Sequence, residues 1–151
     1  MHPRTFPTVV VLIAAAAVAT AGTPDRPAIP KDQAQIWPAS QMRWEPMPGI
    51  DGATQAPLWG HPSNGEYGAL YRWPAGTTVP LHSHTHGDHG VIVSGTLVLA
   101  TEGKPAVELG PGSYFSFGSG VRHTTACKAG ADCLFVVHRE GKFDVTMAEK
   151  K

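Results

Sequence analysis

Proline and glycine interrupt this chain so often that they constrain its fold more than any other feature. The sequence holds 17 glycines and 14 prolines, and short runs rich in β-branched and aromatic residues lie between them. Neither residue is tolerated well inside a helix, whereas short apolar runs separated by turns are typical of strands in a sandwich or barrel. We expect about nine short strands, at 55–59, 67–73, 77–84, 91–93, 96–100, 106–109, 113–117, 121–127 and 133–139, with the segment 142–147 closing the chain. The pattern predicts an all-β, antiparallel sandwich or barrel.

The N-terminus has the pattern of a secretory signal. Arg4 precedes an apolar run over residues 8–18, and Ala19 and Ala21 supply the small side chains that a signal peptidase reads. The run is shorter than the roughly 20 residues that a transmembrane helix needs. We therefore expect cleavage after Ala21 and a periplasmic or secreted protein.

The remaining chain is expected to hold one domain. Residues 22–34 are rich in proline and are expected to form a flexible leader, residues 35–146 the domain, and residues 147–151 a C-terminal tail. The whole chain has 12 basic and 12 acidic side chains, and removing residues 1–21 takes away Arg4 and no acid. The resulting excess of one acidic residue argues against a nucleic-acid partner, and no membrane contact is expected after cleavage.

The two cysteines, Cys127 and Cys133, bracket the turn-like segment KAGAD. In an exported protein they are expected to form a disulfide across a hairpin. Two free thiols and ligation of a soft metal are the alternatives.

The segment LHSHTHGDHG, residues 81–90, holds four of the chain's eight histidines. If 77–84 is a strand, His82 and His84 share one face and form half of a metal site. Asp88 or His89, at the start of the next strand, could supply a third ligand, and His123 arrives from a distant strand. From these residues alone a metal centre and a solvated polar surface both remain open.

Two segments resemble the paired motifs of the cupin family. Residues 76–95, GTTVPLHSHTHGDHGVIVSG, match the first motif of Gly, five residues, His-x-His, three or four residues, Glu, six residues and Gly. Residues 112–127, GSYFSFGSGVRHTTAC, match the second motif of Gly, five residues, Pro-x-Gly, two residues, His, three residues and Asn. Asp88 stands at the position of the motif Glu, Gly118 at that of the Pro, and Cys127 at that of the Asn.

The resemblance covers roughly residues 35–145 and is strongest to a subgroup of small, single-domain exported cupins of unknown function. It implies a double-stranded β-helix, a jelly-roll barrel with a metal near one open end. The implied ligands are His82, His84 and His123, completed by His89 or by Asp88. Because neighbours on a strand point to opposite faces, only one of these two is expected to point inward. We prefer His89 and keep Asp88 as the alternative, since Asp is one methylene shorter than the Glu of the motif.

The resemblance further implies one divalent transition metal, with iron, manganese, zinc, nickel and copper not distinguished. A His-rich site with open positions suits a dioxygenase-type enzyme acting on a small chelating substrate. The alternative is a non-catalytic periplasmic protein that binds or senses a metal or small ligand. Dimers through sheet packing are also implied, and no further catalytic or substrate-binding residue is identified. Aromatic side chains that could wall a pocket, or simply pack the core, are Trp59, Tyr71, Trp73, Tyr114, Phe115 and Phe117.

Overall fold

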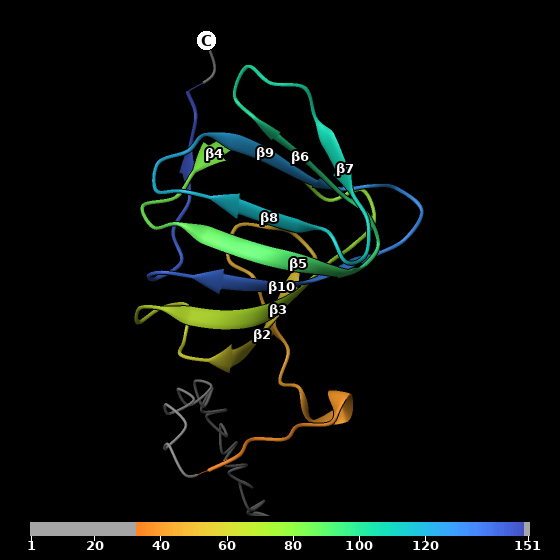
Figure 1. Ribbon diagram of the computed structural model, residues 1–151, viewed down its shortest axis with the longest axis vertical. Coiled ribbons are helices and arrows are strands. Elements are labelled where there is room, and N and C mark those ends of the chain that lie inside the picture. Colours follow the sequence, from red (N-terminus) through yellow and green to blue (C-terminus); the bar gives the residue numbers. More distant parts are fainter. Residues whose placement is uncertain (1–32, 150–151) are drawn as a thin grey trace, which may run out of the picture.

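The computed structural model describes residues 33–149 (Figure 1). The predicted signal sequence and most of the predicted leader lie outside the described residues, so cleavage after Ala21 stays a prediction. The described chain consists of strands and one short 3-10 helix, η1 (Ala39–Gln41). In this part of the chain, no helix is long and apolar enough to span a bilayer.

The strands form two antiparallel sheets. In chain order they are β1 (Glu45–Pro46), β2 (Thr54–Trp59), β3 (Tyr67–Trp73), β4 (Thr78–Ser83), β5 (Asp88–Ser94), β6 (Leu97–Thr101), β7 (Val107–Leu109), β8 (Tyr114–Phe117), β9 (His123–Cys127), β10 (Cys133–Arg139) and β11 (Thr146–Met147). One sheet has the order β1-β2-β3-β10-β5-β8 and the other the order β11-β4-β9-β6-β7 (Figure 1). Consecutive strands such as β5 and β6 lie in different sheets, as in a jelly roll. The predicted all-β, antiparallel jelly roll is confirmed.

Strands β5 and β10 are neighbours in the six-stranded sheet, and their pairing fixes the position of several polar and charged side chains. Asp88 lies opposite Arg139, and in the next position His89 lies opposite His138. Residues on β10 alternate between buried and half-buried, with Cys133, Phe135, Val137 and Arg139 pointing inward. The two cross-strand pairs therefore lie on opposite faces of the same sheet.

A β-bulge in β4 shifts its register against β9 between Val79 and His82. Val79 lies opposite Thr125, but His82 lies opposite His123, so three residues along β4 are matched by two along β9. Pro80 lies inside the irregular stretch, where a residue without a backbone N–H does the least harm to the ladder. As a result both Val79 and His82 are buried.

The core lies between the two sheets and is dominated by aromatic and aliphatic side chains. Its largest members are Tyr67, Tyr71, Trp73, Ile92, Leu97 and Phe135. Edge-to-face contacts place the ring of Phe135 against those of Tyr71 and Trp73, with ring centroids 5.5 Å apart in each case. Such contacts stabilise the core beyond the burial of area alone.

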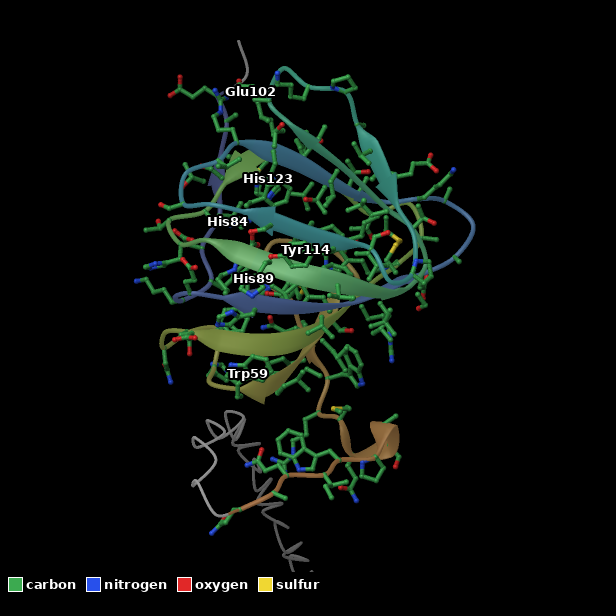
Figure 2. All side chains as sticks on the ribbon, viewed as in Figure 1. Trp59, His84, His89, Glu102, Tyr114 and His123 are labelled. Atoms are coloured by element: carbon green, nitrogen blue, oxygen red, sulfur yellow. A yellow bond between two sulfur atoms is a disulfide. The ribbon has the colours of Figure 1, made fainter. Side chains whose placement is uncertain are left out.

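The disulfide ties the two sheets together at one end. Cys127, the last residue of β9, is bonded to Cys133, the first residue of β10, as predicted. His123 lies at the other end of β9, and Figure 2 shows the disulfide across the molecule from His84 and His123. The covalent link and the histidines thus occupy opposite ends of the jelly roll.

The ends of the domain differ from the expectation. The predicted closing strand 142–147 is reduced to β11, because the backbone before it makes other contacts: the Phe143 N–H donates to the carbonyl of Pro62, and the carbonyl of Asp144 accepts from the ring of His84. The two-residue strand β1 and the helix η1 were not expected.

Candidate metal centre

Three histidines converge inside the jelly roll. His82 lies near the end of β4, His84 follows that strand, and His123 begins β9 directly opposite His82. One potential ligand atom from each ring lies within 4.8 Å of the others, and all three side chains are buried. This cluster contains three of the four histidines expected to bind metal. His82 and His84 are two residues apart and therefore share a face, and the pairing of β4 with β9 places His123 opposite His82.

Each of the three rings is held by a backbone carbonyl. Nδ1 of His82 is 2.7 Å from the carbonyl oxygen of Pro80, Nδ1 of His84 is 2.5 Å from that of Asp144, and Nδ1 of His123 is 2.9 Å from that of Val121. A carbonyl only accepts, so each Nδ1 must carry the proton and donate. In the neutral rings every Nε2 therefore presents a lone pair, the arrangement that histidine ligands require.

The surroundings of the cluster keep these rings neutral. Burial lowers the pKa of His82 and of His123 below the ordinary value. Burial, together with the positive charge of Arg139, lowers the pKa of His84 to about 3. Neutral imidazole is the form that binds a divalent ion, so the cluster fits a metal without first losing protons at neutral pH.

Asp88 and Arg139 form a buried ion pair in the wall of the same cavity. Nη2 of Arg139 donates to Oδ2 of Asp88 over 2.6 Å, and both side chains are almost fully buried. Within the described residues, Oδ1 of Asp88 and Nε and Nη1 of Arg139 have no hydrogen-bond partner. Burial raises the pKa of Asp88, and the neighbouring guanidinium opposes that rise.

The two alternatives for the fourth ligand lie on opposite faces of β5. Asp88 points into the cavity, in register with the motif, but it lies outside the compact three-histidine cluster and is paired with Arg139. His89 points outward, where its Nε2 is 3.2 Å from Nδ1 of His138. The structure thus does not bring His89 to the other three histidines, because the one-residue step along the strand turns it away.

The cavity itself is small and mostly apolar. It has a volume of about 40 Å³ and is walled by aromatic rings beside the three histidines: Tyr71, Trp73, Phe115, Phe117, Phe135 and Phe143. The ring of Phe117 stacks on His123, with centroids 3.9 Å apart and an angle of 8° between the planes. Four of the six aromatic residues proposed from sequence line this cavity, whereas Trp59 and Tyr114 are exposed.

Arg139 is the site residue that sequence reasoning missed. It ends the run CLFVVHR, in which every second residue faces inward, and that alternation places a charge at an inward position. A buried guanidinium is rare unless it is paired. The same alternation was therefore the available signal for a polar group inside the jelly roll.

Comparison with solved structures identifies the fold. RemF, a polyketide cyclase from Streptomyces resistomycificus, is 18% identical with a TM-score of 0.65, covering 79% of this chain and 88% of that chain. The dimethylsulfoniopropionate (DMSP) lyase DddQ from Ruegeria pomeroyi is 20% identical with a TM-score of 0.57, covering 72% and 61% of the two chains. The complex of SigE with the anti-sigma factor ChrR from Rhodobacter sphaeroides contains a chain that is 22% identical with a TM-score of 0.54, covering 68% and 51%.

The family is assigned from the sequence match. No curated protein matches the chain. The model of the ChrR cupin-like domain matches residues 32–142, which include all three histidines of the cluster and the Asp88–Arg139 pair. The chain therefore belongs to the ChrR cupin-like domain family, within the cupin superfamily.

Proposed function

We propose that the protein binds one divalent transition metal through Nε2 of His82, His84 and His123, and acts as a metal-dependent, dioxygenase-type enzyme on a small chelating substrate. The observation that carries the proposal is the state of the three rings. Each is buried, each is held by its Nδ1 proton, and one ligand atom of each ring lies within 4.8 Å of the others. Three protein ligands leave positions open for a substrate.

The bound metal would supply Lewis acidity and, if it is iron or manganese, redox chemistry. The chain's own groups would select and position the substrate. The free donors of Arg139 and the free oxygen of Asp88 are the polar groups in the cavity wall that lack partners among the described residues. They suit a ligand that carries both a hydrogen-bond acceptor and a donor. The aromatic walls and the small volume favour small substrates over large ones.

A second candidate function is metal-dependent sensing or binding without turnover, in the periplasm or outside the cell. The family match and the likeness to a chain in the SigE–ChrR complex support it. The disulfide supports an oxidising compartment for either function. Export itself rests on the signal pattern in residues 1–21.

Metal analysis of the protein purified without added metal tests the proposal. We expect about one equivalent of a divalent transition metal per chain, lost in His123→Ala and kept in His86→Ala, by plasma mass spectrometry. Iron or manganese, with oxygen consumption on addition of a small chelating substrate such as a β-diketone or a thiol, supports the enzyme. Stoichiometric zinc without turnover supports sensing or binding. Equal metal content in the parent and His123→Ala contradicts both.

A further inference from the structure

The outer face of the six-stranded sheet carries a second pair of histidines. His89 on β5 and His138 on β10 lie directly opposite each other, one position away from the inward ion pair. Figure 2 shows His89 on β5, with Tyr114 on the neighbouring β8 and Trp59 on β2. We propose that His89 and His138 form a second, solvent-facing site for a divalent transition metal, separate from the three-histidine cluster.

The spacing of the two nitrogens fits a shared ion. Nε2 of His89 and Nδ1 of His138 are 3.2 Å apart. Two imidazole nitrogens bound to one ion at about 2.0–2.1 Å, at tetrahedral or right angles, are separated by roughly 2.9–3.4 Å. The pair therefore already has the separation that chelation requires, and directly opposed strand positions hold it there.

Glu66 orients the second ring. Oε1 of Glu66 accepts a hydrogen bond from Nε2 of His138 over 2.7 Å. In the neutral ring this leaves a lone pair on Nδ1, the atom that faces His89. A carboxylate behind a histidine is the usual arrangement around histidine ligands, since it fixes the tautomer and raises the basicity of the ligating nitrogen. In the metal-free protein, Nε2–H of His89 donates to that lone pair. Binding needs the other neutral tautomer of His89 and a turn of the two rings, because an ion bonded to both nitrogens lies off the line that joins them.

Two aromatic residues flank the pair on the outer face. The ring of Trp59 lies 6.1 Å from that of His138, and the ring of Tyr114 lies 6.2 Å from that of His89. Trp59 can lie flat on the sheet because Gly68 has no Cβ; one there would be 2.1 Å from the indole. His138 keeps 26% of its side chain exposed, so an ion reaches the pair from solvent.

The donor set indicates which ion binds best. Two neutral imidazoles favour borderline divalent ions, and among these copper(II) binds nitrogen ligands most tightly. Copper(II) is therefore the probe of choice. The remaining coordination positions would be filled by solvent or by an added ligand.

Copper titration of the full chain, stripped of metal and free of any histidine tag, tests this proposal by calorimetry and electron paramagnetic resonance. We expect His89→Ala to bind one equivalent fewer than the parent, with loss of a nitrogen-ligated copper signal, and His138→Ala to behave in the same way. His86→Ala is the matched control and should bind as many equivalents as the parent. Glu66→Gln should weaken the outer site by about 10-fold or more.

The inner cluster is read separately in the same titration. His123→Ala should lose the inner equivalent and keep the outer one, so failure of the inner site leaves this proposal standing. Circular dichroism checks that each variant is folded. If His89→Ala and His138→Ala bind as many copper equivalents as the parent, the two rings form a hydrogen bond only and the second site does not exist.

Discussion

The two faces of the β5–β10 strand pair carry different chemistry within one residue step. On the inner face, Asp88 and Arg139 are buried and joined by an ion pair in the wall of the histidine cavity. On the outer face, His89 and His138 are half-buried and hydrogen-bonded to each other, and His138 also donates to Glu66. Strand alternation alone separates a charged wall of the proposed metal centre from a solvent-facing pair of ligands.

The two faces differ in how much free energy of folding is lost when one member of a polar pair is removed. Inside, each charge depends on its partner because water cannot replace it. Outside, solvent can replace each contact, so the same kind of pairing contributes little to stability. The inner face is therefore expected to be sensitive to single substitutions, and the outer face tolerant of them.

The largest effect is expected from removing one member of the inner pair. Arg139→Met leaves the Asp88 carboxylate buried without its cation, and we expect a loss of about 3–5 kcal/mol in the free energy of unfolding, measured by urea denaturation. The double variant with Asp88→Asn should lose much less than the sum of the single changes. An Arg139→Met protein as stable as the parent would mean that the inner pair is hydrated rather than buried.

A smaller but clear effect is expected from acid on the metal-free protein. Burial lowers the pKa of His82, His84 and His123 in the fold, so between their folded values and about 6.5 the unfolded chain binds more protons. The stability that these neutral rings contribute is fully present above pH about 6.5. It is lost as the pH falls toward about 3, where His84 becomes protonated in the fold.

His84→Gln isolates this contribution, since glutamine does not titrate. We expect its unfolding free energy to fall less steeply than that of the parent between pH about 6.5 and 3, as followed by chemical denaturation. Parallel curves for the two proteins would show that His84 is as easily protonated in the fold as in the unfolded chain.

Much of the fold and of the inner cluster could be predicted from the sequence. Strand alternation and the spacing of the two motifs are local properties, and they placed His82, His84 and His123 together. The disulfide was also predictable, because Cys127 and Cys133 flank one turn between two strands. The disulfide is a local contact, whereas bringing His123 to His82 and His84 needs β4 to pair with β9, which the resemblance to the paired cupin motifs implied.

The rest depends on which strands become neighbours. The preference for His89 over Asp88 rested on the side chain of Asp being one methylene shorter than that of the motif Glu, and the structure places Asp88 inward. Arg139 was missed because its partner comes from β5, distant in sequence. The pairing of His89 with His138 likewise exists only because β10 lies beside β5.

The smallest effect is expected on the outer face. Glu66→Gln removes the carboxylate behind His138, but the Glu66 side chain is 64% exposed, and we expect a change below about 1 kcal/mol in the free energy of unfolding. A thermal or urea transition measured beside that of Arg139→Met gives the contrast directly. A cost equal to that of Arg139→Met would remove the distinction between the two faces.

Anomalous diffraction at a metal absorption edge, from crystals of the protein with its own metal, tests the central claim most directly. The account predicts a peak inside the jelly roll about 2.0–2.2 Å from Nε2 of His82, His84 and His123, with their Nδ1 atoms still bonded to backbone carbonyls. Metal-loaded crystals with no peak among these three rings would contradict it.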